Sequence, residues 1–306
     1  MAETPHSPSA LPNGLQEFLS AGDISGPGRH ARAWFRFSRN PIAVLGLVMI
    51  VLVLFAALAA PWLVPYPEHV GSYVNFMQRH KPPSMAHWMG TDNVGRDILT
   101  RVMYGYRVAL LLVAGVLGIA VPIGVALGIL AAWFAGLTET IIMRLNDMLL
   151  AVPPLVLALA ITTVLEPSLI NAMFAISFLW WNWHCRLVYR LAKSIVTEDY
   201  IEAAKLSGAS HWHIIRHEIL PNCIAAITVK TTLDAGFVIL FGATLSFLGL
   251  GVQPPTPDLG TMVSTGANYL PEYWWESMMP GMAILFAILG FNLLGDGLRD
   301  FFDVEV

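Results

Sequence analysis

Residues 42–64 read IAVLGLVMIVLVLFAALAAPWLV, and the run contains no charged side chain. A helix that crosses a bilayer needs about 20 consecutive residues that are mostly apolar. The run is long enough for one crossing, and the proline at position 65 ends it. This stretch decides the fold class, because it predicts a membrane-spanning helix near the start of the chain.

The composition of the whole chain points the same way. Of its 306 residues, 56% are hydrophobic and 12% are charged, and the net charge is −4. Soluble domains carry about 25% charged residues, and half that share cannot cover a soluble surface. The chain is therefore predicted to be a polytopic membrane protein. Its slight negative charge does not indicate nucleic-acid binding, and its two cysteines cannot form a disulfide framework.

Five more apolar runs follow, at residues 108–135, 148–165, 169–185, 223–250 and 277–294. Six spans predict an all-α fold whose two termini share one side of the membrane. Arginine and lysine are more frequent in the segments on that side, so the positive-inside rule places both termini in the cytoplasm. The polar first 40 residues lack the apolar core of a signal peptide, which argues against a cleaved one.

The predicted organisation has five parts: a cytoplasmic tail at 1–40, a first span at 41–65, an external loop at 66–106, a core domain with five spans at 107–300, and a cytoplasmic tail at 301–306. Within the core domain, residues 195–222 form a polar cytoplasmic loop. Residues 251–276, rich in proline, glycine and aromatic residues, form an external loop with a re-entrant or interfacial part.

Three local patterns refine the spans. Gly124 and Gly128 have the GxxxG spacing, which indicates either close helix packing or ordinary filling by small residues. Pro122 predicts a kink in the same span. Three tryptophans late in the fourth run predict an aromatic belt at the membrane interface: Trp180, Trp181 and Trp183.

The polar cytoplasmic loop contains the sequence EDYIEAAKLSGASHWHIIRHEILPN at residues 198–222. It predicts a helix at 200–206, a stop at Gly208, a cap for a second helix at Ser210, and a further helix that begins at Pro221. The second helix carries one apolar stripe, formed by Trp212, Ile215 and Ile219. Because it is too short to span the membrane, it is expected to lie on the membrane or dock into a partner.

The same segment resembles the EAA motif of the permeases of binding-protein-dependent ABC importers. Glu202, Ala203 and Ala204 are followed at the motif's spacing by Gly208 and then by Leu220 and Pro221. Glu218 stands where the motif usually has isoleucine. The resemblance implies a coupling helix that seats in a groove of a cytoplasmic ATPase, with a contact set drawn from the motif and the stripe: Glu202, Ala203, Ala204, Gly208, Trp212, Ile215, Ile219, Leu220 and Pro221.

Four other segments resemble the dipeptide, oligopeptide and nickel permeases of that family, specifically the second, C-type subunit. They are HWMGTDNVGRD at 87–97, RLND at 144–147, LSFLGLGVQPP at 245–255 and FNLLGDGLRD at 291–300. Phe241 and Gly242 depart from the pattern, since many relatives have an acidic residue there. The resemblance covers nearly the whole chain and implies a type I importer permease in the bacterial inner membrane.

That resemblance also implies the partners and the cargo. They are a homologous second permease, two ATPase subunits that bind ATP and Mg²⁺, an external substrate-binding protein and the lipid bilayer. Di- or oligopeptides are the expected cargo, with nickel, glutathione or opine-like solutes as the alternative. A non-transporting membrane scaffold or receptor is the alternative from another class. A secondary transporter is less favoured, because no second half repeats the pattern.

Three histidines, His211, His213 and His217, fall within seven positions. His213 and His217 would share a helix face, as paired zinc ligands do. However, the sequence after His217 and Glu218 lacks the second histidine of a catalytic HExxH site. A solvated or partner-facing helix is the favoured interpretation, and a metal site is the alternative.

Lys230 and Asp234 lie inside the fifth run, four residues apart and therefore on one helix face. At about 1.5 Å per residue they lie about 13 and 20 Å beyond Pro221. A charge in the bilayer core costs at least about 2.5–3.5 kcal/mol. The pair is expected either to line the translocation path or latch its inner gate, or to form a structural ion pair against the companion permease, and the sequence favours neither.

Asp92, Arg96 and Asp97 lie in the external loop within a turn-like sequence. A fixed network inside the loop is the favoured interpretation, and contact with the binding protein is the alternative. The chain contains neither a Walker A motif nor a nucleophile elbow. It is therefore expected not to be an enzyme and to hold no cofactor or metal of its own.

Overall fold

The computed structural model describes residues 38–302, and its regular secondary structure there is helical apart from one isolated bridge between Thr91 and Asp97. The predicted tails, 1–40 and 301–306, fall outside this range except for residues 38–40, 301 and 302. The longer helices are α3 (Pro41–Leu63), α4 (Ile98–Phe134), α5 (Gly136–Leu150), α6 (Pro154–Val164), α7 (Leu169–Val196), α10 (Leu220–Phe247) and α12 (Trp275–Phe302). The shorter ones are η1 (Pro67–Val70), η2 (Phe76–Gln78), α8 (Asp199–Leu206), α9 (His211–Ile214), a π-helical turn (Ile215–Ile219) and α11 (Leu259–Ala267).

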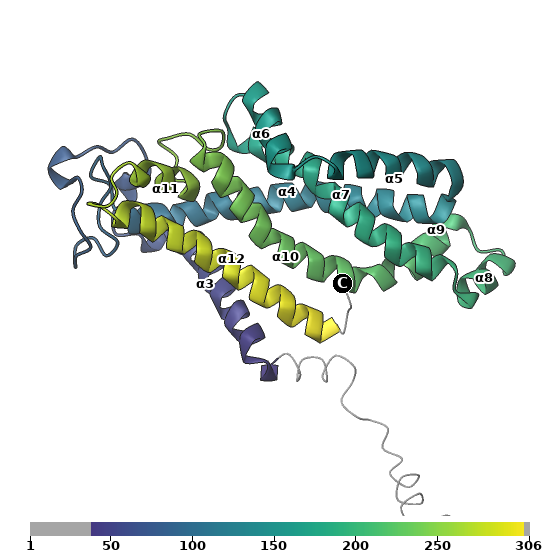
Figure 1. Ribbon diagram of the computed structural model, residues 1–306. Helices are drawn as coiled ribbons and strands as arrows, with labels where there is room; N and C mark the ends of the chain where they lie inside the picture. Colours follow the sequence, from purple (N-terminus) through teal and green to yellow (C-terminus); the bar gives the residue numbers. More distant parts are fainter. Residues whose placement is uncertain (1–37, 303–306) are drawn as a thin grey trace, which may run out of the picture.

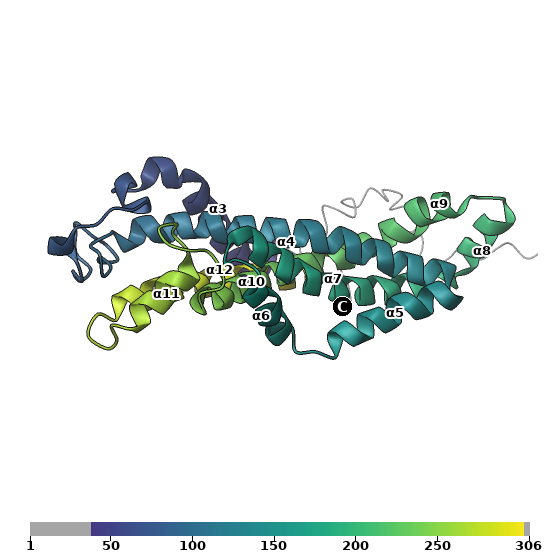
Figure 2. The same cartoon turned by 90° about the horizontal axis from the view of Figure 1, so that it is seen from above.

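These helices form an elongated bundle with polar segments at its two ends. The external loop and α11 lie at one end, and α8 and α9 lie at the other (Figures 1 and 2). By length and composition, four helical segments within residues 38–302 could cross a membrane, or five if α5 and α6 together form one broken span. The all-helical, multi-span prediction is therefore confirmed, whereas the sixth span stays a prediction.

The apolar runs and the helices do not coincide everywhere. α4 begins at Ile98, ten residues before the second run, because the Asp97 carboxylate caps it by accepting from the Thr100 amide at 2.8 Å. This helix continues through Pro122 to Phe134. The third run does not form one continuous helix, because α5 and α6 meet at 87° where two prolines follow Val152.

Close packing of α4 on α7 organises the core. A Cβ atom added at Gly124 would lie 2.5 Å from the Trp181 carbonyl oxygen, and one at Gly128 would lie 2.7 Å from that of Cys185. No larger side chain fits at these distances, so the glycines let the two backbones touch. Of the two interpretations of the GxxxG spacing, the close-packing one is confirmed.

The first span packs in a similar way on the last. A Cβ atom at Gly46 of α3 would lie 2.5 Å from the Leu294 amide nitrogen of α12. Where α3 begins, the Asn40 side-chain amide donates to the Asp300 carboxylate at 2.9 Å. Segments far apart in sequence therefore lie side by side (Figure 1).

The predicted tryptophan belt is wrong for two of its three members. Trp180 and Trp181 are buried in the core formed by α4, α7 and α10. Trp180 packs edge-on against Trp183 and Phe241, with ring centroids 4.9 and 5.0 Å apart. These two indoles therefore pack between helices. α7 continues past them to Val196, so the polar end of this helix lies further along the chain.

Candidate functional site

The EAA segment lies at the end of the bundle opposite the external loop (Figure 1). Its first helix, α8, ends where Gly208 adopts a φ of +81°, the left-handed conformation that favours glycine. The Ser210 hydroxyl then caps α9 by accepting from the His213 amide at 3.3 Å. The helix, the stop and the cap are confirmed as the sequence predicts them.

The second helix does not end before the membrane helix. α9 passes through the π-helical turn straight into α10, whose first turn contains Pro221. Proline has no amide hydrogen and its ring excludes the carbonyl one turn back. The Leu220 amide, just before this proline, donates to the Ile215 carbonyl, which lies five residues earlier and not the four of an α-helix. The loop is thereby continuous with α10.

The predicted apolar stripe is wrong as a single partner-facing surface. Ile215 and Ile219 are buried inside this chain with Ile201 and Ile214, against Val188 of α7. They fasten the loop to the bundle. Trp212, by contrast, is 69% exposed.

The exposed surface of the loop lies on both sides of Gly208. Leu206 is 85% exposed, and no atom lies within 4 Å of the position that a Cβ at Gly208 would take. Glu202 and Ala203 are also exposed. Leu206 and Trp212, on either side of Gly208 along the chain, form an exposed apolar rim. The open glycine between them leaves room for the backbone of another protein to approach.

Trp133, at the end of α4, holds the loop from the other side. Its indole nitrogen donates to Nδ1 of His211 at 3.1 Å, and the Lys205 ammonium lies 4.9 Å from its ring centre. Sequence analysis did not select this residue, because nothing in the local pattern around Trp133 links it to a segment more than 70 positions away. Its place at the end of an apolar run was the only available signal.

The three histidines serve contacts within the chain. His213 and His217 stack with ring centroids 4.4 Å apart, and the His217 ring contacts the His213 carbonyl at 3.0 Å. His211 bonds to Trp133 instead. Within residues 38–302, no group of three or more histidine, cysteine or acidic side chains could hold a metal ion.

Lys230 and Asp234 form an ion pair along α10, and a third residue joins them. His184 of α7 is fully buried, and its Nε2 lies 3.6 Å from the second Asp234 oxygen. His184 also lies at the α4–α7 crossing, because a Cβ atom added at Gly124 would lie 2.7 Å from the Cβ atom of His184. Nothing in the sequence marks His184, because α7 contains no other histidine and no acidic residue.

The ion pair lies at a cavity of about 300 Å³. Its other lining residues come mainly from α7 and α10 and are mostly aromatic: Pro154, Trp180, Trp183, Phe237 and Phe241. Phe241, the departure from the family pattern, thus contributes an aromatic wall. A pair of charges in a mostly apolar cavity is an arrangement typical of small-molecule sites, in which a few polar groups orient the ligand.

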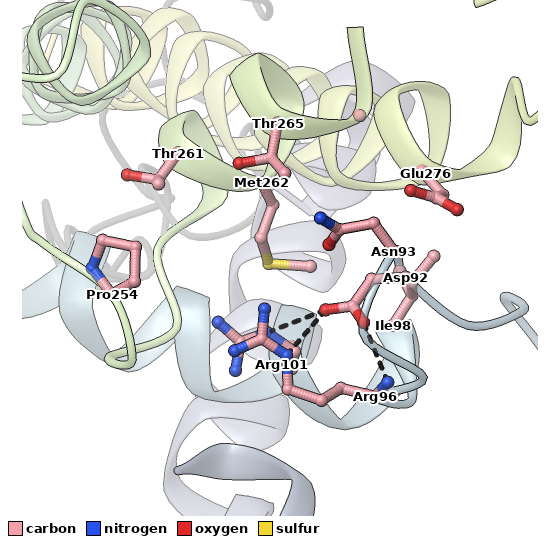
Figure 3. A pocket seen from close by; sticks show the side chains of 11 residues that line it. Asp92, Asn93, Arg96, Ile98, Arg101, Pro254, Thr261, Met262, Thr265 and Glu276 are labelled. Carbon is pink, nitrogen blue, oxygen red and sulfur yellow. Dashed lines mark hydrogen bonds and ion pairs between the residues drawn. The ribbon is translucent and has the colours of Figure 1, made fainter. Parts of the chain in front are cut away.

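At the opposite end, the external loop is held by a network of charges (Figure 3). One Asp92 oxygen accepts from the amides of Val94 and Arg96 at 3.0 and 2.8 Å. The other lies 2.7 Å from Nε of Arg96 and 3.9 Å from Nε of Arg101. Arg101 is buried and donates to the Pro255 carbonyl at 3.3 Å, so it ties the two external loops together.

Asp97 is buried beneath that network. Besides capping α4, its carboxylate lies 2.9 Å from Nδ1 of His87, and its amide donates to Nδ1 of His69 at 2.8 Å. Burial lowers the pKa of His69, which keeps this ring neutral and able to accept. The geometry supports the fixed-network interpretation for Asp97.

Replacing Asp97 with alanine is therefore expected to destabilise the protein by about 2 kcal/mol or more, since a helix cap is lost and a buried histidine loses its partner. Thermal unfolding of the detergent-solubilised protein measures this. Glu68→Ala is the control, because Glu68 is exposed and 3.9 Å from His69, and its effect should stay below about 0.5 kcal/mol. Unchanged stability with weakened binding-protein affinity would favour a contact role instead.

Comparison with known protein families gives two matches. Residues 124–306 match a family described as the binding-protein-dependent transport system inner membrane component. Residues 30–83 match the N-terminal TM domain of oligopeptide transport permease C. The first match contains the EAA segment, Lys230 and Asp234, and it covers more than half of the chain.

Individual relatives are similar over most of their length. A probable D,D-dipeptide transport system permease protein of Escherichia coli is 42% identical over 264 residues, which are 86% of this chain and 88% of the relative. A di/tripeptide transport system permease protein of Pseudomonas aeruginosa is 39% identical, with 89% and 91% covered. A dipeptide transport system permease protein of E. coli is 42% identical, with 89% and 92% covered.

Proposed function

Because the chain belongs to the family of binding-protein-dependent transport system inner membrane components, we propose that it is the second permease subunit of an ATP-driven peptide importer. The observation that carries this proposal is the similarity over nearly the full length to permeases of dipeptide and di/tripeptide transport systems. The chain is a multi-pass inner membrane protein. Nickel, glutathione or opine-like solutes would use the same machinery and are the alternative cargo.

Two cytoplasmic ATPase subunits would bind ATP and Mg²⁺ and supply the energy, because this chain has no phosphate-binding motif of its own. Their docking surface on this chain would be the rim around Gly208, where Glu202, Ala203 and Trp212 would contact the ATPase. Ile215, Ile219, Leu220 and Pro221 would act behind it, since they join the loop to α10. Ala204 is half-buried, and its small side chain would let α8 pack closely on the bundle.

The topology follows from the same assignment. Six crossings, formed by α3, α4, the broken pair α5 and α6, α7, α10 and α12, would place both termini in the cytoplasm. Two α5–α7 ion pairs support α7 as part of the membrane bundle: Asp147 with Arg186 at 3.0 Å and Glu139 with Lys193 at 2.8 Å. The external loop would then face the substrate-binding protein.

A homologous second permease would complete the path. Lys230 and Asp234 are the residues of this chain that we assign to it, because their cavity is polar at one point and aromatic elsewhere. In the external loop, Asp92, Arg96 and Asp97 would shape the surface that meets the binding protein, with Asp97 acting from beneath.

Co-purification tests the proposal against a non-transporting scaffold. The tagged protein should bring down a second permease and ATPase subunits, and the purified complex should hydrolyse ATP faster when the binding protein and a dipeptide are added. Isolation of the chain without any ATPase, from membranes in which the partners are present, would contradict the proposal.

A further inference from the structure

The aromatic cavity at α7 and α10 has the size of a small-molecule site. Its volume is about 300 Å³, at the lower limit of small-molecule sites, which span about 300–1,000 Å³. It is large enough to hold the terminal residue of a peptide. Trp180, Trp183 and Phe241 supply wide apolar faces for a side chain.

The two charges at this cavity are not equally accessible. The Asp234 side chain is 2% exposed and that of Lys230 is 24% exposed. Asp234 bonds to Lys230 on its own helix, and its second oxygen, which has no hydrogen-bond partner among the described residues, lies 3.6 Å from Nε2 of His184. Both residues line the cavity, and the ammonium is the more accessible of the two charges.

The ammonium has donors to spare. A lysine ammonium carries three N–H groups, and within residues 38–302 Asp234 is its one hydrogen-bond partner. A second carboxylate could accept from the other N–H groups without breaking the ion pair. Asp234 keeps the cation from being isolated in the membrane when the cavity is empty, since a lone buried charge is costly.

We propose that this cavity, here called the Lys230 subsite, holds the C-terminal carboxylate of a peptide in transit. Lys230 donates to the carboxylate, and the aromatic walls contact the side chain of the last residue. Asp234 and His184 act as positioning residues that hold the ammonium at the cavity. The inference rests on the proposed function and adds to it the peptide group that this chain recognises.

The test uses the complete complex in proteoliposomes with its binding protein and a labelled dipeptide. Lys230→Met should lower uptake at least about tenfold, the factor that one charge-assisted hydrogen bond of about 1.4 kcal/mol corresponds to. Lys230→Arg should keep most of the uptake, because the charge and the donors remain.

A double variant separates this role from a structural ion pair. Removing both partners of a structural pair is often tolerated, so Lys230→Met/Asp234→Asn would then restore uptake. The Lys230 subsite predicts that uptake stays low although the complex assembles. Wild-type uptake by the double variant overturns the inference.

The peptide terminus provides a second readout that folding does not affect. Uptake of a free dipeptide is compared with uptake of its C-terminally amidated form, using the same binding protein for wild type and the double variant. The preference of the binding protein cancels between the two complexes. The ratio of free to amidated uptake should fall in the variant, and an unchanged ratio contradicts the inference. Failure of the wild-type complex to transport any peptide would instead contradict the proposed function.

Discussion

Replacing Gly208 with arginine is expected to abolish uptake while the protein still enters the membrane and folds. Gly208 has a φ of +81° and faces open space. A side chain there costs about 1–2 kcal/mol in backbone strain but meets nothing within this chain. The main effect is therefore on the partner, because a long charged side chain fills the gap into which the ATPase fits.

Two companion variants distinguish strain from obstruction. Gly208→Asn keeps the left-handed conformation at little cost and should retain part of the uptake. Gly208→Ala carries the same backbone strain as Gly208→Arg but adds only one carbon atom, so it should retain clearly more uptake than the arginine variant. Uptake and ATPase co-purification are measured together, and normal values of both for Gly208→Arg would place the docking surface elsewhere. A transition-metal chelator, added with excess Mg²⁺-ATP, should change nothing.

Replacing Gly124 with leucine is expected to destabilise the bundle by about 3 kcal/mol or more, which is the upper part of the range for overpacking. Its first side-chain carbon would lie 2.5 Å from the Trp181 carbonyl oxygen and 2.7 Å from Cβ of His184. Backbone atoms cannot rotate away, so α4 and α7 must separate. The His184 contact with Asp234 would be displaced as well.

The matched control lies six positions earlier on the same helix. Gly118 is exposed, and no atom lies within 4 Å of its added Cβ. Gly118→Leu should change the unfolding temperature of the detergent-solubilised protein by little, whereas Gly124→Leu should lower it strongly. Equal stability of the two variants would show that the α4–α7 crossing is not what holds the core.

Features governed by local rules could be predicted from the sequence. The apolar run at 42–64 corresponds to α3, and Gly208 and Ser210 mark the stop and the cap in the EAA segment. Backbone conformation and capping depend on neighbouring residues, so a single sequence carries that information. The GxxxG spacing was ambiguous until its partner helix was known.

Features that depend on distant contacts could not be predicted. Apolar spacing alone does not say which of Trp212, Ile215 and Ile219 packs inside the chain, and the structure divides them. Trp180 and Trp181 have the composition of an interfacial belt, but they are buried because α7 continues past them. His184 acquires its role only where α7 meets Asp234.

The central claim is that ATP hydrolysis by partner subunits, docked at the loop around Gly208, drives peptides through this chain and its companion. Vectorial uptake by proteoliposomes tests it most directly. The account predicts that a labelled dipeptide accumulates only when ATP is on the side of α8 and α9 and the binding protein is on the side of the external loop. Equal accumulation without ATP, driven by a proton gradient alone, would contradict it.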